Sequence, residues 1–161
     1  MEYSIIHATE DQLDQICAIW EAGWHEAHAA IVPGNLAQLR THESFLERAA
    51  ELIENTFVAS DGTAVLGFYM VKDDELYQMY VAPKARGVGL AQALISDAEK
   101  RIRAQGHTSA WLACAVGNDR AGRFYEKSGW MNAGPTVVEL DTSSGAFPLE
   151  VWRFEKDLNT S

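Results

Sequence analysis

The segment from Glu75 to Gln105 constrains the fold of this chain more than any other. Its first part, Leu76 to Val81, is a run of aliphatic and aromatic residues typical of a β-strand, and Pro83 ends it because proline has no backbone N–H to donate to a sheet. From Leu90 onward, apolar residues recur at helical spacing with polar residues on the opposite face. The segment therefore predicts a strand, a loop and an amphipathic helix.

The loop in this segment has the sequence RGVGLA, Arg86 to Ala91. Gly87 and Gly89 allow the backbone to turn tightly and to approach a ligand closely. The first N–H groups of the helix have no intrahelical acceptor, and the helix dipole and Arg86 add positive charge at the same point. The loop therefore predicts an anion site that suits a pyrophosphate.

Two familiar phosphate loops do not fit this spacing. A Walker loop needs lysine and serine or threonine after its second glycine, but Leu90 and Ala91 follow Gly89. A dinucleotide fingerprint needs a small residue where Gln92 stands and an acid at the end of the next strand, and the strand predicted at Trp111 to Val116 has none. The loop alone is also consistent with a plain strand-to-helix connection, so the choice depends on a second motif.

The second motif directly follows the strand at Trp111 to Val116. Residues Asn118 to Trp130 read NDRAGRFYEKSGW and match the pattern Asn-x-x-Ala-x-x-Phe-Tyr-x-x-x-Gly-aromatic at each defined position. Together with Arg-x-x-Gly-x-Ala at Arg86 to Ala91, this sequence resembles the GNAT family of N-acetyltransferases. Both motifs follow predicted strands in the expected order, and the resemblance extends from the opening helix to the last strand.

The resemblance implies a fold and a cosubstrate. The fold is a single α/β domain of the α+β type, with a central, mixed, mostly antiparallel sheet flanked by helices. Its fourth and fifth strands, which end at Val81 and Val116, splay apart to hold the pantetheine arm of acetyl-CoA. Asn118 is also well suited to capping the helix that follows it. The residues implied to bind the cosubstrate are Met79, Tyr80, Val81, Arg86, Gly87, Val88, Gly89, Leu90, Ala91, Asn118, Ala121 and Tyr125.

Two residues are candidates for the proton transfers, and the resemblance implies direct attack of an amine in a ternary complex without a metal. An alkylamine with a pKa of about 10.4 is mostly protonated at neutral pH, so a base must take its proton. Glu75 is the candidate base, and its alternative is an exposed acid beside Asp73 and Asp74. Tyr125 is the candidate acid for the departing thiolate, and its alternative is a half-buried core tyrosine. Cys114 lies in an apolar strand and is expected to be inert.

The acceptor is expected to be a small cationic amine. Glu75, Asp73, Asp74 and Glu21 favour cations, while Trp20, Trp24 and Trp130 offer aromatic surface. Trp24, His25 and His28 are candidate acceptor-side residues by resemblance, and this outweighs a metal triad of Glu21, His25 and His28. A protein or peptide N-acetyltransferase and a non-catalytic acyl-CoA-binding module remain as alternatives.

Composition restricts the cellular location and the partners expected for this protein. The chain has 161 residues, 47% of them hydrophobic, and no apolar run long enough to span a bilayer. A net charge of −10 argues against nucleic acid and anionic membranes as partners. The first residues lack the features of a signal peptide, and two cysteines without metal-ligand spacing suit a reducing cytoplasm. A homodimer is left open.

The remaining elements follow from periodicity and turn residues. Asp61-Gly62-Thr63 between two β-type runs predicts a hairpin. We expect one domain over residues 1–157 and a polar tail from Leu158 to Ser161. The other expected elements are a strand at Tyr3 to His7, a helix at Leu13 to Ala27, a second helix near Leu36 to Leu39 or from Ser44 to Ile53, hairpin strands at Thr56 to Ser60 and Ala64 to Val71, and a final pair at Val137 to Leu140 and Phe147 to Glu155.

Overall fold

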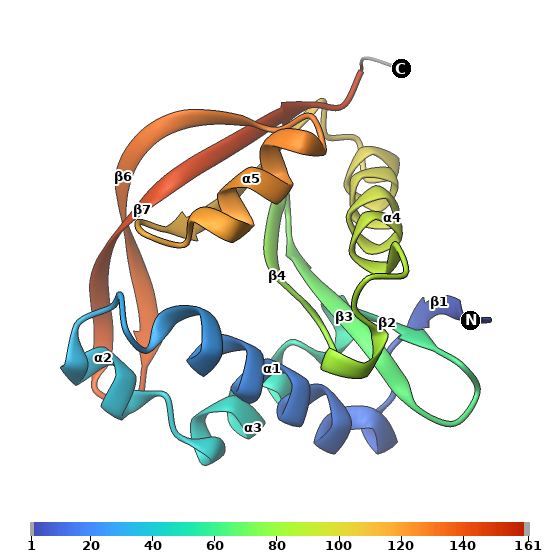
Figure 1. Ribbon diagram of the computed structural model, residues 1–161, viewed down its shortest axis with the longest axis horizontal. Coiled ribbons are helices and arrows are strands. Elements are labelled where there is room, and N and C mark those ends of the chain that lie inside the picture. Colours follow the sequence, from blue (N-terminus) through green and yellow to red (C-terminus); the bar gives the residue numbers. More distant parts are fainter. Residues whose placement is uncertain (1, 160–161) are drawn as a thin grey trace.

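The computed structural model describes residues 2–159 and contains one seven-stranded sheet with the order β1-β2-β3-β4-β5-β7-β6 (Figure 1). All neighbouring strands are antiparallel except β4 and β5, so the predicted mixed, mostly antiparallel sheet is confirmed. The strands are β1 (Ser4–His7), β2 (Thr56–Ser60), β3 (Val65–Lys72), β4 (Glu75–Val81), β5 (Ser109–Ala115), β6 (Met131–Thr142) and β7 (Gly145–Asp157).

Helices cover both faces of the sheet and create two cores (Figure 1). The α-helices are α1 (Leu13–His28), α2 (Gly34–Leu39), α3 (His42–Glu51), α4 (Leu90–Ala104) and α5 (Asp119–Lys127). The predicted apolar face of α4 is buried against the sheet, and α1, α2 and α3 contribute to the second core. Over residues 2–159, no helix has the length and apolar character needed to cross a membrane.

The strands β4 and β5 diverge from a single point of contact. Glu75 pairs with Trp111 in parallel register, and the Trp111 N–H donates to the carbonyl of Asp74 at 3.1 Å. No further β4–β5 pair occurs within residues 2–159, while β5 pairs with β7 from Ser109 to Ala115. The predicted splay of the fourth and fifth strands is therefore present, and it leaves the end of β4 near Val81 free of a neighbour on that side.

A β-bulge changes which side chains of β4 face each core. The register of β3 and β4 shifts between Met70 and Val71, which leaves Tyr77 as the extra residue of β4. Tyr77 and Tyr80 consequently pack against the core of α1 to α3, whereas Met79 packs against the core of α4. Strict alternation would have placed Tyr77 and Met79 on the same face.

The largest differences from the expected boundaries lie in the second helix and in the final strands. Both alternatives for the second helix form, as α2 and α3, because Pro33 and Thr41 each begin a helix at their own position. The final strands are longer than expected because β6 continues through an irregularity at Gly134 and Pro135, residues that look like a break in the sequence.

The packed part of the chain also ends later than expected. Leu158 is only 5% exposed, and its N–H donates to the carbonyl of Thr108 at 2.9 Å. Leu158 therefore belongs to the core rather than to a polar tail. Residues 160 and 161 of that predicted tail lie outside the described residues.

The contact between α1 and β4 gives a prediction for stability. A Cβ atom at Gly23 would lie 2.5 Å from Cδ1 of Tyr80, closer than real Cβ contacts. Alanine favours a helix interior by about 1 kcal/mol over glycine, but overpacking a core costs about 1–3 kcal/mol. We expect Gly23→Ala to lower the free energy of unfolding by about 1 kcal/mol in urea denaturation. Gly34→Ala is the control because nothing lies within 4 Å of its Cβ position, and equal stability of the two variants would contradict the prediction.

Candidate functional site

The gap between β4 and β5 opens into a cavity of about 850 Å³. Its walls come from both strands, from α1 and α5, and from the β6–β7 hairpin. The sequence-predicted residues that line it are Glu75, Met79, Tyr80, Val81, Arg86, Ala91, Asn118, Ala121 and Tyr125. Gly87, Val88, Gly89 and Leu90 are not among its lining residues, and the side chain of Leu90 is buried in the core.

The loop before α4 has the backbone expected of an anion site. Gly87 and Gly89 adopt left-handed conformations, with φ of 80° and 81°, and Gly89 caps the helix. No atom lies within 4 Å of the Cβ position of either glycine, so the loop surface is open to a ligand. The first N–H groups of α4 point out of the helix here because no earlier turn supplies their acceptors.

Arg86 forms an ion pair with Glu26 of the neighbouring helix α1. Its guanidinium donates to both carboxylate oxygens of Glu26 on α1, at 3.1 Å each, and this contact holds the pKa of Glu26 below its ordinary value. A phosphate at the loop would have to compete with Glu26 for Arg86. The backbone donors and the dipole of α4 therefore carry more of the attraction for an anion than the sequence suggested.

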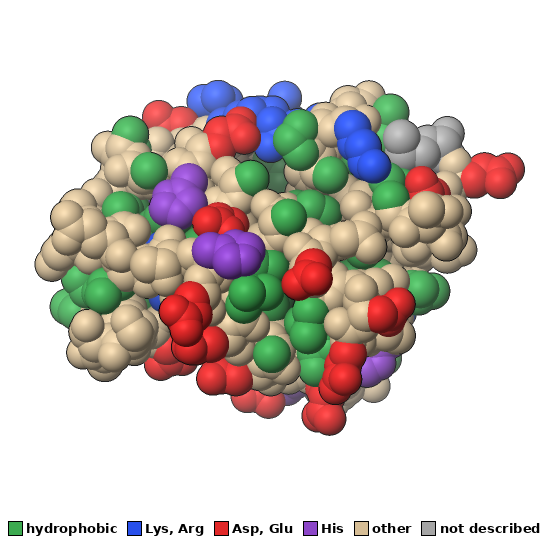
Figure 2. All heavy atoms as spheres, turned by 90° about the horizontal axis from the view of Figure 1, so that it is seen from below, with side chains coloured by type: hydrophobic (Ala, Val, Ile, Leu, Met, Phe, Trp, Pro, Cys, Tyr) green, Lys and Arg blue, Asp and Glu red, His purple; other side chains and the backbone are tan. Residues whose placement is uncertain are grey.

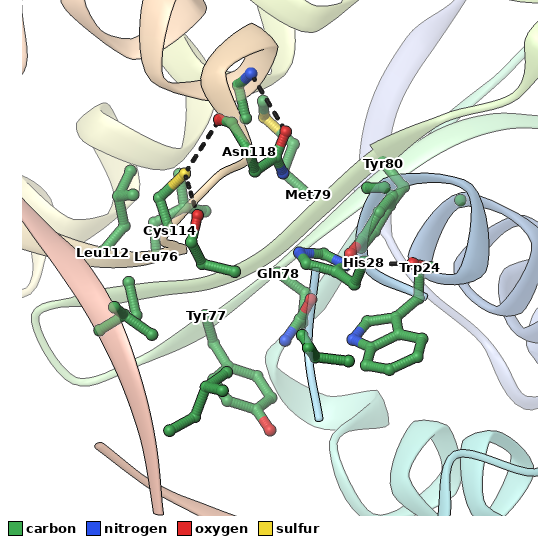
Figure 3. A pocket seen from close by; sticks show the side chains of 18 of the residues that line it. Trp24, His28, Leu76, Tyr77, Gln78, Met79, Tyr80, Leu112, Cys114 and Asn118 are labelled. Carbon is green, nitrogen blue, oxygen red and sulfur yellow. Dashed lines mark hydrogen bonds between the residues drawn. The ribbon is translucent and has the colours of Figure 1, made fainter. Parts of the chain in front are cut away.

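Asn118 begins α5 and also lines the cavity (Figure 3). Its side-chain oxygen accepts the Ala121 N–H at 3.4 Å, so the expected role as a helix cap is observed. The Cys114 thiol donates to the Asn118 carbonyl at 3.7 Å, and burial raises the pKa of Cys114 to about 12. A thiol that stays protonated is a poor nucleophile, which agrees with the expectation that Cys114 is inert.

Tyr125 presents a protonated phenol to the cavity. Its ring packs against Phe124 and Phe154, with centroid distances of 5.6 and 5.5 Å. Burial raises the pKa of the Tyr125 phenol, and the nearby Cys114 acts in the same direction. Tyr125 therefore keeps its proton at neutral pH and can donate it to a group in the cavity.

Glu75 lies where β4 and β5 meet and lines the same cavity. Burial raises the pKa of Glu75 to about 7, opposed by Lys72 and Arg153 and assisted by Asp74. Such a carboxylate can accept a proton near neutral pH. Met79 follows Glu75 by four positions, roughly 13 Å along β4, so a proton from an amine near Met79 would have to travel through water or along the acceptor.

His28 is a second group in the cavity that can accept a proton. Its Nδ1 lies 3.1 Å from the carbonyl of Trp24, and since a carbonyl only accepts, Nδ1 carries the proton and Nε2 has the free lone pair (Figure 3). Burial lowers the pKa of His28, which favours the neutral ring. His28 and Trp24 line the cavity as expected, whereas His25 bonds the carbonyl of Arg40 and does not.

Most of the acids and tryptophans expected near the acceptor lie elsewhere. Asp74 accepts the indole N–H of Trp111, and Glu21 accepts a hydrogen bond from His42. Long-range packing decides these contacts, and it also buries the rings of Trp20 and Trp130 in the two cores. Among the acids and tryptophans expected near the acceptor, Glu75 and Trp24 line the cavity. The others, Asp73, Asp74, Glu21, Trp20 and Trp130, do not line it.

Glu21, His25 and His28, the possible metal triad, each bond a different partner: His42, the Arg40 carbonyl and the Trp24 carbonyl. Cys17, Glu21 and His42 instead place one ligand atom each within 4.8 Å of one another. Burial and nearby acids raise the pKa of Cys17 to about 11, which disfavours the thiolate that a metal requires. The bond of 2.6 Å between Glu21 Oε2 and His42 Nδ1 already accounts for the other two groups.

Two arginines line the cavity that the sequence did not indicate as site residues. Arg40, at the end of α2, and Arg48, on α3, both line it. Arg48 lies over the ring of Trp20, with its Cζ 4.4 Å from the ring centroid. In the sequence each arginine looks like an ordinary cation in or beside a short helix, so no local signal distinguishes them.

Comparison with known proteins agrees with this geometry. The model of the acetyltransferase (GNAT) family matches residues 14–130. An uncharacterised N-acetyltransferase of Mycobacterium tuberculosis is 28% identical over 117 residues, which cover 70% of this chain and 72% of the relative. The match spans the loop of Arg86 to Ala91 and the motif of Asn118 to Trp130, the two segments on which the resemblance was based.

Solved structures share the whole fold. A GCN5-related N-acetyltransferase from Rhodopseudomonas palustris superposes with a TM-score of 0.74 at 18% identity, over 98% of this chain and 96% of that one. An acetyltransferase from Salmonella typhimurium, solved with its cofactor acetyl-CoA, has a TM-score of 0.67 at 16% identity, over 100% and 96%. These identities show similarity of fold, while the family model covers most of the chain. This chain therefore belongs to the GNAT family of acetyltransferases.

Proposed function

We propose that this protein transfers the acetyl group of acetyl-CoA to the primary amine of a small molecule, by direct attack in a ternary complex. The observation that carries the proposal is the cavity between β4 and β5, which is lined by Arg86 and Ala91 of the anion loop, a protonated Tyr125 and a carboxylate with a pKa of about 7. The pyrophosphate of CoA would lie at the loop of Arg86 to Ala91. The pantetheine arm would lie along Met79 to Val81, with Asn118 and Ala121 on the opposite wall.

The proposed reaction uses two protein groups for proton transfer and no metal. Glu75, through water, takes a proton from the acceptor ammonium, and the free amine attacks the thioester carbonyl carbon. The C–S bond then breaks, the sulfur leaves as a thiolate that takes the Tyr125 proton, and the nitrogen of the new amide gives its second proton to water. Exchange with solvent returns the proton to Tyr125 and removes it from Glu75.

A contact between α2 and β6 in the wall of the cavity favours a small acceptor over a peptide. Nη1 of Arg40 donates to the carbonyl of Asp141 at 2.7 Å, which ties the end of α2 to β6. Arg40 and Asp141 both line the cavity, so this bridge is part of its wall. A compact amine fits within such a wall more readily than an extended chain.

Surface charge and cysteine chemistry support the setting proposed for this reaction. Acidic side chains are prominent on the face that carries α1, α2 and α3 (Figure 2), which disfavours nucleic acid and anionic membranes as partners. Cys17 and Cys114 are both buried free thiols, as is usual in a reducing compartment such as the cytoplasm. A homodimer is compatible with these features.

The proposal is tested by incubating the protein with acetyl-CoA and a panel of small amines, and measuring free thiol and acetylated amine. We expect amine-dependent release of CoA with one acetylated product per thiol. A parallel panel of peptides with free N-termini and lysines separates the main alternative, because acetylation of peptides alone would replace a small acceptor with a protein. Binding of CoA without any transfer would indicate an acyl-CoA-binding module.

The role of Glu75 gives a pH prediction. Glu75 works as a base only when ionised, so kcat/KM of the wild type should rise with pH through about pH 7. Glu75→Gln should lose this rise and regain part of the rate at higher pH, where the acceptor deprotonates in solution. Asp73→Asn is the matched control, since Asp73 is exposed and does not line the cavity.

The same profiles distinguish Glu75 from His28. If neutral His28 acts as the base, kcat/KM should rise with pH below pH 6.5, because burial lowers the pKa of His28. His28→Gln should then remove this rise in kcat/KM. Profiles of Glu75→Gln and wild type that are parallel at all pH values would remove Glu75 from the mechanism. In that case a flattened profile for His28→Gln would identify the base.

A further inference from the structure

Two guanidinium groups in the wall of the cavity, a buried one on Arg40 and a half-buried one on Arg48, lack complete hydrogen-bond partners. Arg40 is 2% exposed, and its Nη1 donates to a carbonyl while its Nε is buried without a hydrogen-bond partner. Nη2 of Arg48 donates to the Tyr77 hydroxyl at 2.9 Å, while its Nη1 is buried and unpartnered. Within residues 2–159, neither arginine has a carboxylate at ion-pair distance.

This arrangement is unfavourable without an anion. A buried charge needs a paired counter-charge or full hydrogen bonding to offset its desolvation. Burial and the neighbouring Arg48 lower the pKa of Arg40 to about 10, which shows that the two cations oppose each other. Even the lowered pKa leaves Arg40 charged at neutral pH, so two positive charges persist at this end of the cavity.

The acids nearby do not neutralise these cations. Asp141 lies close enough to favour the charged form of Arg40, yet the contact that the two residues make runs through the Asp141 carbonyl. Glu139 also lines the cavity but forms no ion pair with either arginine. Lys72 adds a further cation nearby, with its Nζ 3.7 Å from the centroid of the Tyr77 ring.

The bulge in β4 turns Tyr77, the partner of Arg48, toward the side of the cavity formed by α1 to α3. Tyr77 is the extra residue of β4, and with Tyr80 it faces the core of α1 to α3 rather than that of α4. In Figure 3, Tyr77 and Gln78 project into the cavity away from Met79 and Asn118. Arg48, which donates to the Tyr77 hydroxyl, therefore lies on the side of the cavity opposite the proposed path of the pantetheine arm.

We infer that Arg40 and Arg48, positioned with Tyr77, bind a carboxylate of the acceptor, so that the substrate is an amino acid or another small amine that carries an anionic group. The inference rests on the proposed function and narrows its substrate class. Unpartnered guanidinium N–H groups are matched donors for a carboxylate. The acceptor then presents its ammonium toward the thioester and its carboxylate toward α2 and α3, which adds an anionic group to the small cationic amine expected from the sequence.

The experiment compares matched acceptors with the wild-type protein and acetyl-CoA. Each set contains an ω-amino acid, its uncharged amide, the amine without the acid group and the aminoalkylphosphonate, for several chain lengths. We expect kcat/KM to be roughly ten- to hundredfold higher for the amino acid than for its amide. A preference for the phosphonate would identify phosphate-like chemistry in the same subsite, and equal values for acid and amide would overturn the inference.

Substitutions of Arg40 and Arg48 test whether these residues cause the preference for the amino acid over its amide. Arg40→Met and Arg48→Met should each remove most of the difference in kcat/KM between acid and amide, chiefly by raising KM for the acid. Arg40→Lys should keep part of it because the charge remains. Arg103→Met is the control, as Arg103 is an exposed arginine on α4 that does not line the cavity, and loss of the preference in this variant would contradict the assignment.

A binding measurement separates this inference from the proposed function. With CoA present, butanoate should raise the melting temperature of the wild type but not that of Arg40→Met or Arg48→Met, and butanamide should raise neither. If no amine is acetylated but butanoate binds in this way, the proposed function fails and the anion subsite stands. If amines are acetylated but butanoate and butanamide act alike, the subsite fails and the proposed function stands.

Discussion

Replacing Gly89 with glutamate is expected to abolish binding of CoA and, with it, acetyl transfer. Gly89 has a φ of 81° and caps α4, at the point where the N–H groups of the helix are open to an anion. A glutamate there strains the backbone by about 1–2 kcal/mol and brings a negative charge against the pyrophosphate. The wild type should gain about 2.7 kcal/mol of stability at a ligand concentration of 100 times Kd, and the variant should gain none.

Thermal unfolding with and without acetyl-CoA measures this difference. Gly62→Glu is the matched control, because Gly62 has a φ of 98° with nothing within 4 Å of its Cβ position and lies in the β2–β3 hairpin, outside the loop before α4. It carries similar backbone strain and the same added charge, yet it should keep the full response to acetyl-CoA. A Gly89→Glu protein that is stabilised as much as the wild type would refute the placement of CoA at this loop.

Tyr125→Phe is expected to lower kcat by roughly ten- to ten-thousand-fold, the range of a lost general acid. The ring contacts with Phe124 and Phe154 are retained, so only the hydroxyl proton is removed. Without that proton, the thiolate leaves into a cavity that solvates it poorly. The dissociation constant of CoA should change little, because the loop before α4 and the strand β4 hold the cofactor.

Stopped-flow measurement of CoA release with an active acceptor separates the chemical step from product release. Tyr69→Phe serves as the control, since it removes the hydroxyl that donates to Asp97 at 2.6 Å in a core that does not line the cavity. That variant should lose stability and keep kcat. Unchanged single-turnover rates in Tyr125→Phe would reduce Tyr125 to a packing residue.

Local patterns in the sequence were sufficient for the motifs that define this family. The spacing of Arg86 to Ala91 determines a left-handed glycine turn and an open helix start, and both depend on neighbouring residues alone. Asn118 caps α5 through a residue only three positions away. The apolar stripe of α4 likewise identified its buried face, because helical periodicity is a local property.

The sequence did not reveal which charged residues line the cavity, because this depends on contacts between distant segments. Glu21 lies on the expected helix, but His42 takes up its carboxylate. Arg40 meets Asp141 across 101 positions of sequence, a contact that no periodicity reveals. The expected small cationic acceptor followed from Asp73 and Asp74 beside Glu75 and from Glu21 on the first helix, whereas none of these three acids lines the cavity.

The sequence by itself determined the family, the glycine turn before α4 and the candidates Glu75 and Tyr125, since each belongs to a short segment whose meaning depends on its neighbours. Tertiary structure alone decided which charged groups line the cavity. The unpaired residue Tyr77 in β4 turns that part of the strand toward α1 to α3, and the packing of α2 and α3 places Arg40 and Arg48 in the same cavity wall. Burial and long-range pairing set these environments, and both depend on the folded chain as a whole.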